Sequence, residues 1–120
     1  MDYVQLLEGV EIAAGVTRER AAEATIATLV TLAERISPEE ARELRAELPR
    51  ELREAMDTGT TPQEEFTADE FVRRVATRES VTPTEARAHA REVLATLRQD
   101  AAALEALRTR LPDDYRPLFG

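Results

Sequence analysis

One stretch of this sequence occurs twice, and that repetition limits what the chain can fold into more than any other feature. Residues 16–35 and 81–99 align at an offset of 65, which pairs Val16 with Val81 and Thr17 with Thr82. Each copy is followed by a second shared stretch, LPRELREAM at 48–56 and LPDDYRPLF at 111–119. The repetition predicts two copies of one unit: repeat one at 1–57, a linker at 58–65 and repeat two at 66–120.

Both copies have the sequence signals of helices. Apolar residues recur every three or four positions, which is the spacing of an amphipathic helix. At 37–40 and 82–85 a hydroxyl side chain is followed by proline and then by glutamate, a combination that starts a helix with a capping box. Gly15 permits the left-handed backbone that ends a helix. Further helix caps are expected at Asp2, Thr17, Thr67 and Asp100.

These signals predict an all-α protein with eight helices and no strand. Neither half carries enough leucine, isoleucine and phenylalanine to be stable alone. We therefore expect two tandem four-helix repeats packed into one helical bundle domain that spans residues 1–120.

The clearest difference between the copies lies on the second helix. Its apolar residues Ile26, Val30 and Ala33 align with Arg91, Ala95 and Arg98 of the sixth helix. One interpretation is that the second helix is central and that the other repeat covers this stripe. The other is that the stripe is a surface patch for a second copy or another protein. Ile26→Arg should lower stability in the first case and abolish an association in the second.

A Leu-Pro motif closes each repeat and indicates a structural role. Proline starts a short helix at a corner, the fourth residue after leucine fills the core, and the arginine is expected to bond carbonyls that end the preceding helix. The motif residues are Leu48, Pro49, Leu52 and Arg53 in the first copy, and Leu111, Pro112, Tyr115 and Arg116 in the second.

The chain shows no pattern typical of a catalytic or metal site. It has no cysteine, so thiolate zinc sites and thiol nucleophiles are excluded. Its only histidine, His89, forms a row with Glu85 and Glu92 on one helix face. A di-iron bundle needs two Glu-x-x-His pairs, which are absent, so a half-exposed histidine beside acids is favoured. No order of Ser, His and Asp suggests a triad. We expect no enzyme activity, metal or cofactor.

Charge further narrows the classes of partner. The net charge is −8, and an acidic surface repels the phosphates of nucleic acids. The third helix carries Glu39, Glu40, Glu43 and Glu47, which form either a solvated face or a surface for a basic partner. No apolar run approaches the roughly 18 residues of a membrane span. The first residues lack the positive charge of a secretory signal, so a cytoplasmic location is expected.

Several motifs together resemble a known family. They are FxxDEFVxxVA at 66–76, VTxxEA at 81–86, VLxxLR at 93–98 and LPxDYRxLF at 111–119. The chain resembles, over essentially its whole length, the bacterial family called domain of unknown function 2267, a tandem helical repeat. The first copy departs from the motif at Leu52 and Met56, which stand where the second has Tyr115 and Phe119. The resemblance implies an all-helical cytoplasmic protein and brings no catalytic residue, cofactor or partner.

The features above favour a binding protein. Our first hypothesis is a small protein-protein interaction or scaffold module, whose partner is another protein or a second copy in a homodimer. The alternative is a regulatory protein that binds a small molecule in a pocket between the repeats, near Tyr115 and Phe119. Neither hypothesis involves nucleic acid or a membrane.

Overall fold

The fold is built from helices joined by short turns. The structure, a computed structural model, describes residues 2–56 and 63–119, and these contain no strand. The predicted linker at 58–65 lies mostly outside the described residues. The all-α prediction is confirmed. The helices are α1 (Tyr3–Ala14), α2 (Arg18–Arg35), α3 (Pro38–Ala46), α4 (Arg50–Met56), α5 (Ala68–Glu79), α6 (Pro83–Arg98), α7 (Ala102–Arg110) and α8 (Arg116–Phe119), with a 3-10 turn, η1 (Asp113–Tyr115), before α8.

Local capping explains where most of the helices begin. A side-chain oxygen accepts a backbone N–H of the first turn at five starts, which satisfies a donor that has no partner within the helix. Ser37 and Thr82 also form the complete predicted capping box with the glutamate three residues on, and proline occupies the first turn after each. The five capping residues are Asp2, Thr17, Ser37, Thr67 and Thr82.

The predicted cap of α7 by Asp100 is wrong. The N–H groups of Asp100 and Ala101 both bond to the carbonyl of Leu97, so the chain is still turning out of α6 at that point. Ala101 occupies the cap position without a side-chain bond. The carboxylate of Glu47, at the end of α3, instead accepts the N–H of Ala103 at 3.2 Å. A contact between the two halves therefore replaces the local cap.

A second cap also comes from a distant residue. Thr67 accepts the N–H of Glu70 as predicted, but the Glu70 carboxylate bonds to Arg73 and Arg74 on its own helix. Asp114, in the turn before α8, accepts the N–H of Ala68 at 2.8 Å. The C-terminal turn thus fixes the start of α5.

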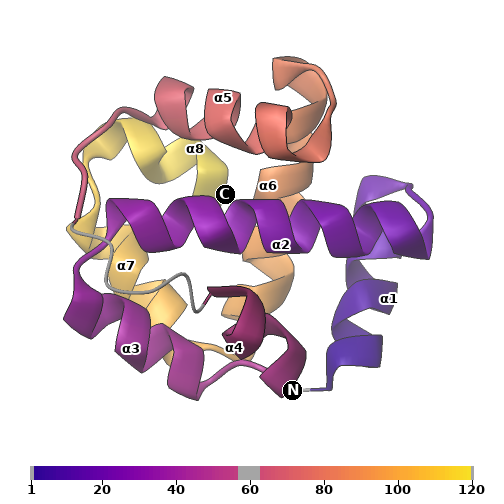
Figure 1. Ribbon diagram of the computed structural model, residues 1–120, viewed down its shortest axis with the longest axis horizontal. Coiled ribbons are helices and arrows are strands. Elements are labelled where there is room, and N and C mark those ends of the chain that lie inside the picture. The colour runs from indigo at the N-terminus through magenta and orange to yellow at the C-terminus, as the bar shows by residue number, and fades with distance from the viewer. Residues whose placement is uncertain (1, 57–62, 120) are drawn as a thin grey trace.

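The two longest helices lie at the centre of the arrangement. α2 and α6 contact each other, and both α1 and α5 pack against each of them. α4 packs against α2, α8 packs against α6, and α3 lies beside α7 (Figure 1). One hydrophobic core therefore runs through both halves of the chain.

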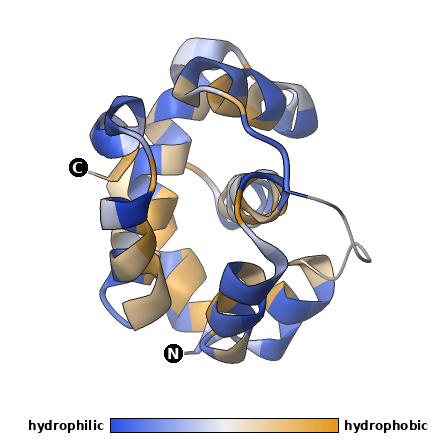
Figure 2. Ribbon diagram, turned by 90° about the vertical axis from the view of Figure 1, so that its left-hand side faces the viewer, coloured by the Kyte–Doolittle hydropathy of each residue, from blue (hydrophilic) through white to orange (hydrophobic). Residues whose placement is uncertain are grey.

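Small residues allow α2 to pack closely on several sides. Ala21, Ala24 and Ala27 are buried, and so are Thr25 and Thr31, whose hydroxyls donate to the carbonyls four residues earlier. Among the described residues, helices lie above α2, below it and on one side of it, and none covers its remaining side (Figure 2). α2 is therefore buried on more than one side. On its remaining side no described helix covers it, and the segment that contains Gln63 and Glu64 bonds to its last turn.

Candidate interaction surface

The open side of α2 carries the predicted apolar stripe. The side chain of Ile26 is 38% exposed, while Val30 and Ala33 are half-buried. The interpretation in which the other half of the chain covers the stripe is therefore wrong at Ile26. We call Ile26, Val30 and Ala33 the α2 surface.

The corresponding face of α6 is polar and already engaged. Arg91 is exposed there, and Arg98 pairs with Glu105 of α7 at 3.1 Å. Arg98 also donates to the carbonyl of Phe119, at the end of the C-terminal helix. The outer face of α2 is therefore apolar, whereas the corresponding face of α6 is charged.

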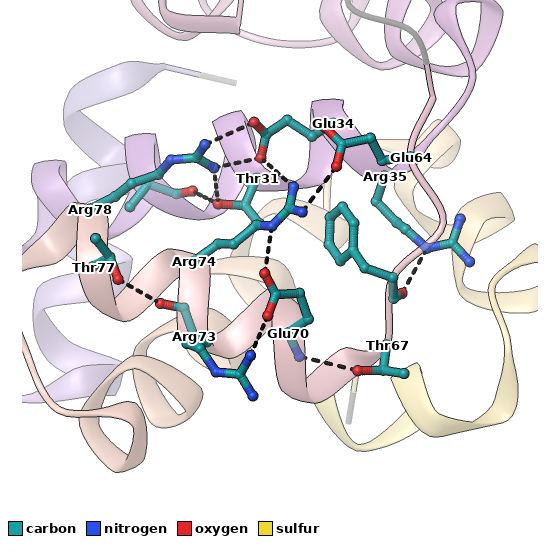
Figure 3. Close-up of polar contacts among 12 residues, drawn as sticks. Thr31, Glu34, Arg35, Glu64, Thr67, Glu70, Arg73, Arg74, Thr77 and Arg78 are labelled. Carbon is teal, nitrogen blue, oxygen red and sulfur yellow. Dashed lines mark hydrogen bonds and ion pairs between the residues drawn. The ribbon is translucent and has the colours of Figure 1, made fainter.

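A polar network fixes α5 along the edge of the α2 surface. Arg78 donates to both carboxylate oxygens of Glu34 at 2.8 Å and to the Thr31 hydroxyl at 2.7 Å (Figure 3). Arg74 reaches the same carboxylate at 3.3 Å. The two guanidinium groups hold the pKa of Glu34 below its usual range, with Arg78 the larger cause. The fixed geometry gives the α2 surface a rigid, charged border.

Arg74 links that border to the segment that precedes α5. Its guanidinium bonds to Glu70 and Glu64 at 3.0 Å each and stacks over the ring of Phe66 at 4.0 Å (Figure 3). The carboxylates of Glu70 and Glu64 raise the pKa of Arg74, with Glu70 the larger cause. The backbone N–H of Glu64 also donates to the carbonyl of Glu34. Sequence reasoning missed this network, because Arg74 and Arg78 lie 10 to 47 residues from the partners that they bind outside α5.

Tyr115 of the second Leu-Pro motif is buried in the core. Its hydroxyl donates to the carbonyl of Phe66 at 2.6 Å, and Nε of Arg35 donates to the same carbonyl at 3.0 Å. The ring of Tyr115 lies edge-on to Phe71 with 5.9 Å between centroids. Burial raises the pKa of the Tyr115 hydroxyl. Tyr115 and Phe119 are each 1% exposed, so neither side chain is accessible to a ligand in the predicted pocket.

The other motif residues divide into core and surface positions. Leu48 and Leu52 are buried, Leu111 is half-buried, and Pro49 and Pro112 immediately precede the short helical segments as predicted. Arg53 and Arg116 are exposed, and Arg116 pairs with Asp113 at 3.4 Å. The predicted bond from Arg116 to a carbonyl that ends the preceding helix is not formed among the described residues, where Arg116 pairs with Asp113.

His89 is more enclosed than predicted. Its side chain is 12% exposed and its Nδ1 lies 2.7 Å from a carboxylate oxygen of Glu79, whose side chain is fully shielded. Glu85 is used by the capping box of Thr82. Within the described residues, no group of three His, Cys, Asp or Glu side chains could hold a metal ion. Of the row predicted on α6, His89 therefore belongs to a buried pair with Glu79, and Glu85 belongs to a helix cap.

The acidic residues of α3 are partly structural. Glu40 accepts the N–H of Ser37 at 2.9 Å and pairs with Arg110 at 3.4 Å, and Glu47 caps α7. Glu39 and Glu43 are exposed and remain available to solvent or to a basic partner. Glu40 and Glu47 thus connect α3 to α7, and Glu40 also belongs to the N-terminal cap of α3.

None of the described helices has the length and apolar character needed to cross a membrane.

Comparison with known proteins places this chain in a family. No curated protein matches the chain. A family match, described as "Uncharacterized conserved protein (DUF2267)", covers residues 3–118 and so includes both Leu-Pro motifs. The chain belongs to the DUF2267 family, as its motifs indicated.

Proposed function

We propose that this protein is a helical protein-interaction module, not an enzyme, and that it forms a homodimer through the α2 surface. The observation that carries the proposal is the exposure of Ile26, 38% on the one side of α2 that no described helix covers. A β-branched apolar side chain in the middle of a central helix gains free energy when a partner removes it from water.

Charge complementarity favours a second copy as the partner. Near the start of α2, Glu23 pairs with Arg20 and its side chain is still 46% exposed. Beside the second half of α2, Arg78 pairs with Glu34 and its side chain is still 34% exposed. In an antiparallel pair of α2 helices related by a two-fold axis, Glu23 of each copy approaches Arg78 of the other. A two-fold interface is self-complementary in this way, because the same patch serves both subunits.

The size of the patch predicts a weak dimer. A stable interface buries about 800 Å² on each partner. Three partly buried aliphatic side chains supply only a fraction of that area, so the contact must extend onto the α5 border. Association is therefore expected to depend on protein concentration.

Light scattering across a concentration series tests the dimer, with Ile26→Arg as the disrupting variant. Val4→Arg is the matched control, because Val4 on α1 is 47% exposed and lies on a different helix. The wild type and Val4→Arg should approach twice the monomer mass as concentration rises, and Ile26→Arg should stay monomeric with an unchanged fold. Equal masses for all three proteins would refute the proposal.

We also propose that the chain is a tandem duplication of a four-helix unit. The bounds of α5 are those of α1 shifted by 65 residues, and the bounds of α7 are those of α3 shifted by 64. η1 and α8 together occupy the range of α4 shifted by 63. Because α1 and α5 each pack on both central helices, neither half should fold alone. Circular dichroism of residues 1–57 should show little helix, and a folded half would count against this interdependence.

A depression beside Tyr115 favours a second candidate function, the binding of a small regulatory molecule. It measures about 280 Å³ and is lined by Arg35, Phe66, Thr67 and Asp114 among others. The guanidinium of Arg35 lies 5.5 Å from the centroid of the Tyr115 ring and donates to the Phe66 carbonyl, so it offers a fixed cation beside the depression. A ligand present at 100 times its dissociation constant adds about 2.7 kcal/mol to stability. A thermal-shift screen of small anions should then raise the melting temperature of wild type but not of Arg35→Met.

A further inference from the structure

A groove of about 350 Å³ lies between α1 and α6, away from the α2 surface. Its walls include Gln5, Gly9 and Ala13 on α1, and Glu92, Thr96 and Gln99 on α6. Asp100 lies at its end, and none of its lining residues is basic. The groove is therefore polar and negatively charged.

The same place in the other half of the chain is filled by arginines. A shift of 65 residues takes Gly9 to Arg74 and Ala13 to Arg78 on α5, and takes Thr96 to Thr31 and Gln99 to Glu34 on α2. There the two guanidinium groups lie between the helices and bond to Thr31 and Glu34 (Figure 3). The α1–α6 groove is the equivalent interface without its arginine side chains.

Thr96 keeps the acceptor that an arginine uses on Thr31. Both hydroxyls donate to the carbonyl four residues earlier, at 2.8 Å in each case. The Thr31 oxygen also accepts from Arg78 at 2.7 Å. No described residue donates a hydrogen bond to the hydroxyl oxygen of Thr96, and Thr96 is one of the residues that line the groove. The Thr96 oxygen is therefore an acceptor like that of Thr31, but no described side chain takes the place of Arg78 as its donor.

Gly9 keeps the groove from being filled by its own helix. A Cβ at this position would lie 3.0 Å from Cγ2 of Thr96, closer than side chains normally approach. α1 and α6 therefore meet at a glycine, and at this position α1 contributes no side chain to the groove.

We infer that this groove binds an arginine side chain presented by a helix of another protein. The guanidinium would donate to the Thr96 hydroxyl and the Gln99 side-chain oxygen, while Glu92 and Asp100 supply the opposite charge. A partner with arginines four residues apart would reproduce the spacing of Arg74 and Arg78. The inference uses the correspondence of the two halves and does not depend on the homodimer.

An NMR titration tests the inference with a defined probe. The probe is a capped, alanine-rich helical peptide with two arginines four residues apart, and the same peptide with lysines is its control. The arginine peptide should shift the amide signals of Ala13, Thr96 and Gln99, in a salt-dependent way. The lysine peptide should bind more weakly, because ammonium lacks the planar set of donors. Equal binding of both peptides, or shifts spread over all acidic faces, would overturn the inference.

A variant that plugs the groove completes the test. Ala13→Arg places in α1 the side chain that α5 has at Arg78, and Ala46→Arg is the control, because both alanines are exposed in the last turn of a helix. Ala13→Arg should weaken peptide binding about tenfold or more, the effect of losing one charge-assisted contact, and Ala46→Arg should not. Unchanged binding by a folded Ala13→Arg would refute the site. Groove signals that shift on dilution without peptide would show that a second copy fills it instead.

Discussion

Glu79 and His89 form a buried pair across the corner between α5 and α6. The carboxylate oxygen Oε1 lies 2.7 Å from Nδ1 of the ring, and the Glu79 side chain is fully shielded from solvent. The second carboxylate oxygen is also buried and has no hydrogen-bond partner among the described residues. Burial raises the pKa of Glu79, although the bond to His89 opposes the shift. Two side chains of α2 act at longer range: Arg20 lowers this pKa and Glu23 raises it.

We predict that Glu79→Gln stabilises the fold at neutral pH. Because the pKa of Glu79 is raised above its ordinary value of 4.5, the folded state holds this proton more tightly than the unfolded state. The contribution of Glu79 to stability therefore falls as pH rises from 4.5 to the raised value. Glutamine keeps a bond to His89 without a buried charge. Urea denaturation should show a gain of roughly 0.5–1 kcal/mol near pH 7 and a smaller one near pH 4. A loss at both values would mean that a charged carboxylate stabilises the pair.

The parts of this fold that sequence reasoning predicted are those that local chemistry decides. Thr17, Ser37 and Thr82 each bond to an N–H three residues further on, so their role can be read from neighbouring residues. The prediction that Asp100 caps α7 was wrong, because the chain leaving α6 keeps its helical turn for longer than the alignment suggested. Glu47 accepts the N–H of Ala103 in its place.

The candidate sites bring together residues that are far apart in the sequence, so no local pattern predicts their contacts. Glu79 and His89 are 10 residues apart, Glu34 and Arg78 are 44 apart, and the bonded residues Phe66 and Tyr115 are 49 apart. Alignment of the copies showed that Ile26 differs from Arg91, but only packing decides which side of α2 remains open. The α1–α6 groove could have been suspected from Gly9 and Ala13, which replace Arg74 and Arg78 in the alignment.

Arg78→Met should destabilise the protein by about 1 kcal/mol near pH 7, because it removes the two-bond contact with Glu34. A third of the Arg78 side chain is exposed, so solvent screening keeps the loss near the upper end for surface pairs. The pKa of Glu34 is lowered in the folded state, so the stability from this pair is present above 4.5 and disappears as pH falls through the lowered value. Denaturation curves should therefore converge with those of wild type in acid.

Arg73→Met is the matched control for this variant. Arg73 precedes Arg78 on the same helix, is 69% exposed and pairs only with Glu70 among the described residues. The control should change stability by less than about 0.5 kcal/mol. Equal losses for the two variants would mean that the contact with Glu34 has no particular importance.

Asp114→Ala should cost about 1 kcal/mol, the usual effect of losing a helix cap. Its carboxylate accepts the N–H of Ala68 at 2.8 Å and so joins the C-terminal turn to α5. Asp113→Ala is the control, because Asp113 is 90% exposed and pairs only with Arg116 among the described residues. Chemical denaturation should separate the two neighbours. A neutral Asp114→Ala would show that water caps α5 equally well.

The left-handed residues that end α1 and α5 should respond in opposite directions to substitution. Gly15 has φ of 67° and Ser80 has φ of 60°, and Ser80 is the one described residue other than glycine with positive φ. A Cβ at Gly15 would meet no atom within 4 Å, so Gly15→Ala should lose only backbone energy, about 1 kcal/mol. Ser80→Gly relieves the same strain but adds flexibility to the unfolded chain, so it should gain less, roughly 0.5 kcal/mol. Thermal melts of both variants measure these changes. Stabilisation by Gly15→Ala, or a clear loss in Ser80→Gly, would mean that these two helix ends are not governed by backbone strain.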